Sequence, residues 1–148
     1  MNLYQTLKHY FGYDTLRPGQ QDLMEGILNG SDVLGIMPTG AGKSLCYQVP
    51  ALMLPGITIV ISPLISLMSD QVKALNQAGV HAAYINSSLT ENQIRAALLY
   101  AAQGQYKIIY VAPERLNTMR FLDFACRADI SICLLYTSDA ADERSSVD

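Results

Sequence analysis

A short glycine-containing segment constrains this chain more than any other feature. It reads MPTGAGKS, spans residues 37–44 of the 148-residue sequence, and stands between a strand-like and a helix-like stretch. Gly40 and Gly42 allow a tight turn that exposes backbone N–H groups, and a helix starting near Lys43 adds the positive end of its dipole. A loop of this kind between a strand and a helix is typical of phosphate binding. The alternative is an ordinary turn with a solvated Lys43.

The order of residues in this segment predicts a role for each in binding a nucleoside triphosphate. We expect Lys43 to reach the β and γ phosphates, and the Ser44 hydroxyl to bind a magnesium ion bridged to the nucleotide. Lys43 and Ser44 are therefore the candidate catalytic residues, and Ser44 is the candidate Mg²⁺ ligand. Met37 stands where the general phosphate-loop pattern has glycine. The candidate phosphate-loop contacts of the nucleotide are Thr39, Gly40, Ala41, Gly42, Lys43 and Ser44.

A second motif lies upstream, in FGYDTLRPGQ at residues 11–20. A phosphate loop does not select a base, whereas a glutamine amide can both donate to and accept from the edge of adenine. Gln20 precedes Lys43 with one helix between them, so it can fold back over the nucleotide. Tyr13 is a candidate for stacking on the base, and Arg17 for packing over the ring or reaching a phosphate. The alternative for this segment is a capped surface turn.

Strand-like and helix-like stretches alternate along the chain, which predicts an α/β fold with a mainly parallel sheet. Strands are expected over residues 32–37, 57–61, 82–85 and 107–111. Helices are expected over residues 2–10 and 19–28, from near residue 43, from Pro63 to Gly79, from the capping box at residues 90–93 to near Gly104, and from Pro113.

Charge and composition exclude some classes of protein. Residues 1–132 contain nine basic and nine acidic side chains, so the net charge of −3 comes from the last sixteen residues. Neither part is basic, so nucleic-acid binding must be inferred from motifs. No apolar run approaches the roughly 20 residues of a membrane span, and the N-terminus lacks the pattern of a secretory signal. Three cysteines without paired spacing argue against a zinc site or disulfides and fit a reducing cytoplasm.

Four segments together resemble the first motor domain of RecQ-family helicases, in helicase superfamily 2. They are FGYDTLRPGQ, DVLGIMPTGAGKSLCYQVPAL, VISPLISLMSDQV and YVAPERL, and the resemblance covers residues 1 to about 130. It implies a RecA-like phosphate-loop domain, ATP and Mg²⁺ as cofactors, and DNA-stimulated ATP hydrolysis. It also implies 3′ to 5′ unwinding of duplex DNA in recombination and repair, with single-stranded and duplex DNA as partners. Tyr13, Arg17 and Gln20 fall on the adenine motif of that family.

Two further motifs of that family contact the backbone of single-stranded DNA. They fall on ISPLISLMSDQ at residues 61–71 and on APER at residues 112–115. Hydroxyls and a helix start suit phosphate oxygens, although an ordinary helix start at Ser62 and an ordinary turn at residues 86–88 are the alternatives. The candidate nucleic-acid contacts are Ser62, Pro63, Ser66, Asn86, Pro113, Glu114 and Arg115.

The last sixteen residues, CLLYTSDAADERSSVD, change the character of the chain. The family places its magnesium carboxylate and its water-positioning base on a strand ending in Asp-Glu-Ala-His, expected to begin close to Ile130. Residues 133–143 instead resemble a translated sequencing-library adapter. We therefore predict a partial ATP-binding domain over residues 1–132, incomplete on its C-terminal side, and a non-native tail over residues 133–148. The chain as written is then expected to fold poorly and to bind ATP weakly or not at all.

Two other functions stay open. One is a phosphate-loop ATPase or kinase that does not act on nucleic acid, against which Gln20 and residues 61–71 argue. The other is a non-enzymatic nucleotide-binding module, truncated in the organism itself. Stimulation of ATP hydrolysis by DNA separates a helicase from the first, and a true stop codon after the tail favours the second. The sequence predicts no particular protein partner.

Overall fold

The computed structural model describes residues 1–35 and 42–136. Within these ranges the chain divides into two compact units, Met1–Pro55 and Gly56–Tyr136. Each unit contains its own cluster of buried apolar side chains. No helix in the described ranges is long and apolar enough to cross a membrane.

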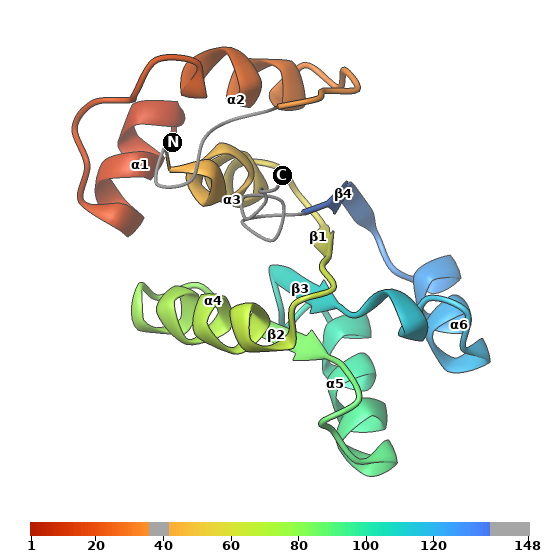
Figure 1. Ribbon diagram of the computed structural model, residues 1–148. Coiled ribbons are helices and arrows are strands. Elements are labelled where there is room, and N and C mark those ends of the chain that lie inside the picture. The colour runs from red at the N-terminus through yellow and green to blue at the C-terminus, as the bar shows by residue number, and fades with distance from the viewer. Residues whose placement is uncertain (36–41, 137–148) are drawn as a thin grey trace, which may run out of the picture. The chain divides into compact units, whose positions relative to one another are not determined.

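The first unit is helical in its described residues (Figure 1). Its helices α1 (Leu3–Phe11), α2 (Gln20–Leu28) and α3 (Lys43–Met53) confirm the expected positions. α1 begins with a capping box, in which the side chains of Asn2 and Gln5 each accept a hydrogen bond from the other's main-chain N–H. Both α1 and α2 contact α3. The buried residues between these helices are Leu3, Leu7, Met24 and Val49.

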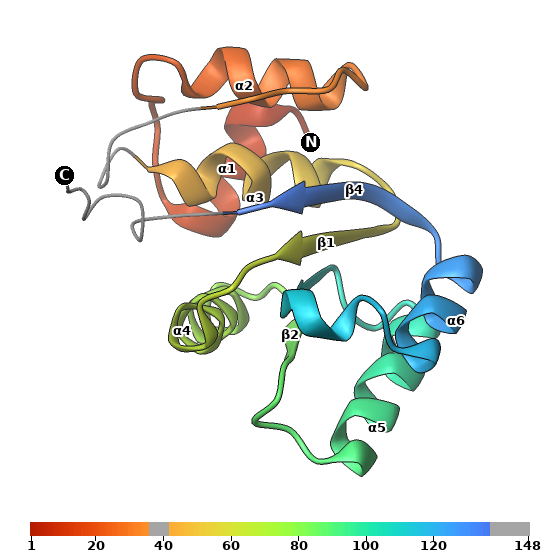
Figure 2. The same cartoon turned by 45° about the vertical axis from the view of Figure 1, so that its right-hand side comes forward.

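The strand expected over residues 32–37 is wrong in its described part, because residues 32–35 are not in a strand. The segment after α2 instead runs back along that helix (Figure 2). Two glycines permit this close approach. A side-chain carbon on Gly26 would lie 2.9 Å from Val33, and one on Gly35 would lie 2.7 Å from Leu23. Packing against α2 therefore takes the place of strand pairing, and residues 36 and 37 lie outside the described ranges.

The second unit contains a sheet whose strands are parallel, which confirms the expected α/β architecture. Among the described residues its order is β2-β3-β1-β4. The strands are β1 (Ile57–Ile61), β2 (Ala82–Ile85), β3 (Ile108–Val111) and β4 (Ile130–Leu135). β1 is buried along its first four residues, as its uninterrupted apolar run predicts.

β4 begins at Ile130, where the sequence predicts a strand, and it pairs with β1. Figure 2 shows the two strands side by side. β4 continues to Leu135, so its last residues come from the segment that the sequence analysis assigns to the tail. The proposed boundary after Ile132 stays a prediction, and residues 137–148 lie outside the described ranges.

Three helices of this unit flank its sheet: α4 (Ile65–Gln77), α5 (Glu91–Ala102) and α6 (Met119–Arg127). Figures 1 and 2 show α4 on one side of the strands, and α5 and α6 on the other. α5 begins with the predicted capping box of Thr90 and Gln93. The buried core beneath α5 and α6 includes Ile59, Ile94, Ile109, Phe121 and Phe124.

Two helix starts differ from expectation. α4 begins two residues after Pro63, because Leu64 is extended, with φ −99° and ψ 102°. Pro113 opens a short 3-10 turn, η1 (Pro113–Arg115), instead of an α-helix. The α-helix that follows begins at Met119, where the Thr118 hydroxyl accepts a hydrogen bond from the N–H of Phe121 at 3.3 Å. A side-chain cap therefore fixes the start of α6.

Candidate nucleotide and nucleic-acid sites

α3 begins directly after the glycine segment, with Lys43 and Ser44 as its first two residues. Both are half-buried. Gly42 is the N-cap residue and has a left-handed φ of 77°, a conformation that favours glycine. Because no side chain of the described residues caps this end, its main-chain N–H groups suit an anion such as phosphate. Thr39, Gly40 and Ala41 lie outside the described ranges.

Gln20 is the first residue of α2, and it is 2% exposed. Its side chain folds back to the start of α3, as the sequence predicts. Its amide nitrogen donates to the carbonyl oxygen of Gly42 at 3.1 Å. Its amide oxygen accepts from the main-chain N–H of Arg17 at 2.7 Å. A side-chain carbon on Gly42 would collide with the Gln20 amide nitrogen. The amide therefore joins the adenine motif to the phosphate-loop helix in this structure.

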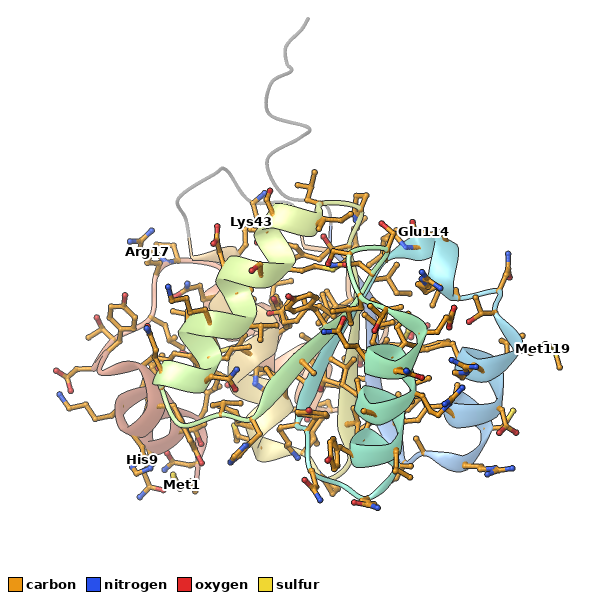
Figure 3. The ribbon with its side chains drawn as sticks, turned by 90° about the horizontal axis from the view of Figure 1, so that it is seen from below. Met1, His9, Arg17, Lys43, Glu114 and Met119 are labelled. Atoms are coloured by element: carbon orange, nitrogen blue, oxygen red, sulfur yellow. The ribbon has the colours of Figure 1, made fainter. Side chains whose placement is uncertain are left out.

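The other two candidates for base recognition, Tyr13 and Arg17, are exposed. Tyr13 is 54% exposed, which leaves its ring accessible to a base. Figure 3 labels Arg17 on the segment before α2, and Lys43 at the start of α3. The roles of Tyr13, Arg17 and Gln20 toward adenine stay predictions.

Ser44 suits magnesium only in combination with other oxygen ligands. No group of three or more His, Cys, Asp or Glu side chains in residues 1–35 and 42–136 is arranged to hold a metal ion. Magnesium in nucleotide sites commonly binds few protein groups, with waters and phosphate oxygens completing its shell. The Ser44 hydroxyl next to a phosphate-binding helix end fits that pattern, and its role as a ligand stays a prediction.

In the second unit, the candidate nucleic-acid contacts follow three adjacent strands. Ser62 comes after β1, Asn86 after β2 and Ala112 after β3. The hydrogen-bond ladder extends one residue past the strands: the Ser62 N–H donates to the Val111 oxygen at 3.1 Å, and the Ala112 N–H to the Ile85 oxygen at 3.0 Å. Because the strands are parallel, these segments meet at the carboxyl edge of the sheet, where α/β proteins commonly bind ligands.

Two of these candidates point inward. Ser62 is 1% exposed, and its hydroxyl accepts from the Leu64 N–H at 3.3 Å. Asn86 is fully buried, and its side-chain oxygen accepts from the Ser88 N–H at 2.8 Å. Both side chains thus shape the turns that follow their strands. Their burial does not support the predicted direct contact with nucleic acid.

The remaining candidates lie on or near the surface. Pro63, Ser66, Pro113 and Glu114 are exposed, and Arg115 is half-buried. Ser66 is the second residue of α4, whose N-terminus has no side-chain cap among the described residues, so main-chain N–H groups there suit a phosphate. Glu114, labelled in Figure 3, carries the same sign as a phosphate. Its contact with DNA is therefore expected through its main chain.

Glu91, which belongs to none of the predicted site motifs, lies beside Arg115. One carboxylate oxygen of Glu91 is 3.8 Å from the Arg115 Nη1 atom. The other accepts a hydrogen bond of 2.9 Å from Arg120 Nη1. Glu91 opens α5, Arg115 ends η1 and Arg120 lies in α6. Because the three come from separate elements, no local sequence pattern predicts their meeting.

Known proteins similar to this chain are helicases. The profile of the DEAD/DEAH box helicase family matches residues 17–134. The proteins named ATP-dependent DNA helicase RecQ from Bacillus subtilis (strain 168) and Haemophilus influenzae are 48% identical over 127 residues and 44% identical over 134 residues. ATP-dependent DNA helicase Q-like 5 of Arabidopsis thaliana is 42% identical over 139 residues.

The three alignments cover 85%, 90% and 94% of this chain, but 22%, 21% and 15% of those relatives. The chain therefore spans about a fifth of the length of the two RecQ proteins.

Proposed function

Because the chain belongs to the DEAD/DEAH box helicase family, we propose that it is the ATP-binding part of an ATP-dependent DNA helicase. The predicted resemblance to RecQ helicases is confirmed by two RecQ proteins, 48% and 44% identical to it. The parallel sheet with helices on both sides fits the RecA-like fold expected from that resemblance. The activity proposed for the whole protein is ATP hydrolysis coupled to movement along DNA.

The start of α3 is the observation that carries this proposal. A left-handed glycine leads into Lys43 and Ser44, and the buried amide of Gln20 is bound to that glycine. The helix end and the Lys43 ammonium attract the phosphates of ATP, and the Ser44 hydroxyl offers an oxygen to magnesium. Magnesium, when bound, supplies positive charge between the phosphates. We infer that the Gln20 amide recognises the adenine base, because it lies beside the start of α3.

The carboxyl edge of the sheet supports single-stranded DNA as the ligand of the second unit. The exposed candidates there are Pro63, Ser66, Pro113 and Glu114, and the charge of Arg115 lies beside them. Main-chain N–H groups and one arginine are suited to the sugar-phosphate backbone, which carries no sequence information. We propose that this edge binds one strand while the protein separates duplex DNA in the 3′ to 5′ direction, in recombination and repair.

The test is ATP turnover by the longer protein that we propose, measured with and without single-stranded DNA. Lys43→Ala is expected to lower the DNA-stimulated rate by about 100-fold or more, because it removes the charge that neutralises the transferred phosphoryl group. The matched control is Lys8→Ala, which removes an exposed lysine of the same unit that is paired with Asp14. That variant is expected to keep the wild-type rate.

The outcomes separate the alternatives. ATP turnover that does not respond to DNA favours a phosphate-loop ATPase that does not act on nucleic acid. ATP binding without turnover favours a nucleotide-binding module. Partial duplexes with a single 3′ or 5′ tail then report direction, and unwinding of the 5′-tailed duplex alone would contradict the proposed 3′ to 5′ movement.

We further propose that the 148-residue chain by itself turns over ATP poorly. We also propose that the whole protein is cytoplasmic. Phosphoryl transfer in such enzymes uses a carboxylate to hold Mg²⁺ and a second group to position water. The strand expected to lead into these residues, β4, reads ISICLL and contains no acidic side chain. Turnover by this chain that is lost in Lys43→Ala would contradict the proposal.

A further inference from the structure

The guanidinium of Arg115 lacks a complete set of acceptors. Its side chain is 22% exposed, and its Nε atom is buried without a hydrogen-bond partner among the described residues. The nearby carboxylate of Glu91 lies 3.8 Å from Nη1, which is an ion pair too long to be a hydrogen bond. An arginine carries five N–H donors in a planar fork. Arg115 is therefore attracted to Glu91 without having its donors satisfied by it.

Glu91 is held from its other side. Arg120 Nη1 donates to one carboxylate oxygen of Glu91 at 2.9 Å and to its main-chain oxygen at 3.3 Å. Glu91 is also the first residue of α5, where the helix dipole favours the negative charge of its carboxylate. These interactions keep the Glu91 carboxylate turned toward Arg120. They explain why it does not approach Arg115 more closely.

We propose that Glu91 acts as an internal competitor of DNA phosphate for Arg115. This proposal rests on the proposed function, in which the segment around Arg115 contacts the DNA backbone. A phosphate accepts two parallel hydrogen bonds from an arginine fork, which the distant carboxylate does not provide. To make that contact, Arg115 must give up its attraction to Glu91, whose own charge repels the arriving phosphate. Glu91 thereby weakens the binding of single-stranded DNA and limits its dependence on salt.

The competitor role gives Glu91→Gln an effect opposite to that of ordinary damage. Glutamine keeps the shape and can still accept from Arg120, but it removes the charge that holds Arg115. If Glu91 had only a structural role, Glu91→Gln would lower stability and weaken DNA binding, because it removes a negative charge from the N-terminus of α5. A competing Glu91 makes the variant a tighter binder, even if it unfolds at a slightly lower temperature.

The experiment measures binding of a fluorescent oligothymidine to the longer protein over a series of salt concentrations, without nucleotide. Glu91→Gln is expected to bind about threefold to tenfold more tightly at low salt, and its log–log salt slope to steepen by about 0.7, as for one more phosphate contact. The matched control is Asp123→Asn. It removes one exposed carboxylate of the same unit, on α6, whose partner is Arg127.

A gain in Glu91→Gln beyond that of Asp123→Asn supports the competitor role. Equal changes of affinity in the two variants would show that only net charge matters, and would overturn the competitor role. Weaker binding by Glu91→Gln would also overturn it, and would show that Glu91 positions Arg115. A second comparison uses Arg115→Ala, in which Glu91→Gln is expected to have no further effect. If the wild type binds DNA and Arg115→Ala binds equally well, the competitor role fails while the proposed function stands. If the wild type does not bind DNA, both fail.

Discussion

The buried amide of Gln20 supports a prediction about stability as well as base recognition. Gln20→Ala removes hydrogen bonds to the main chain of Arg17 and Gly42, each worth about 0.5–1.5 kcal/mol. It also removes one buried methylene group, worth about 0.8 kcal/mol. Together these losses amount to about 2–4 kcal/mol, a large part of the stability of an ordinary domain. The α2 and α3 helices are expected to open more often as a result.

Hydrogen exchange of amides in α2 and α3 measures this directly, because it reports local opening in a longer protein. A loss of about 3 kcal/mol corresponds to exchange faster by about a hundredfold. The control is Gln21→Ala, the next residue, whose exposed amide pairs with Tyr4 and Glu25. A surface change of that kind is expected to cost less than about 0.5 kcal/mol. Equal exchange in the two variants would refute the assignment of Gln20 as a link between the two segments.

Two further predictions concern a strand start and a buried thiol. Gly56→Ala is expected to cost more stability in urea unfolding than Gly79→Ala. Both glycines have positive φ, which costs an alanine about 1–2 kcal/mol, but the new carbon at Gly56 would also lie 2.6 Å from the main-chain oxygen of Asp129. Equal costs would contradict that clash. Burial raises the pKa of the Cys46 thiol, partly offset by a main-chain hydrogen bond, so maleimide is expected to label Cys46 more slowly than exposed Cys126 near neutral pH. Raising the pH is expected to speed the labelling of Cys46 only above the pH at which an ordinary thiol ionises. Equal labelling rates for the two thiols would contradict the burial of Cys46.

Elements with a local cause could be predicted from the sequence. The capping box at Thr90 sets the start of α5, since its hydrogen bonds join residues three apart. The apolar run of β1 predicts a strand whose first four residues are buried, because only a strand covered on both faces hides consecutive side chains. Gly79, with φ 92°, ends α4 as predicted. Each of these signals is complete within a few residues.

The expected strand at residues 32–37 shows where local signals fail. Its apolar residues are also suited to lying against a helix, and pairing depends on a neighbour that the segment itself does not specify. Gly26 and Gly35 provide the space for packing on α2. A glycine inside a strand-like run is a sign of close backbone approach, which in this chain is made to a helix.

The candidate nucleic-acid site, like the fold, could be predicted from the sequence only in part. The resemblance to RecQ helicases predicted candidate contacts after β1, β2 and β3, and the structure shows that these segments share one edge of the sheet. The resemblance did not predict which side chains face inward there. Ser62 and Asn86 are buried and hold their turns, so exposed neighbours and main-chain groups are left to meet a ligand. Substitutions at those two positions should therefore change DNA binding through turn geometry, and lower stability along with affinity.

Pairings between distant segments were beyond sequence reasoning for a different reason. Gln20 is bound to Gly42, 22 residues away, and Arg115 lies beside Glu91 on another element. In each case a group predicted to meet a ligand already has an interaction within the chain. A ligand must compete with that interaction, so its measured affinity is the difference between two sets of contacts. A motif read from sequence names the residues of a site but not this competition, and the opposite effects expected for Glu91→Gln and Arg115→Ala on DNA binding follow from it.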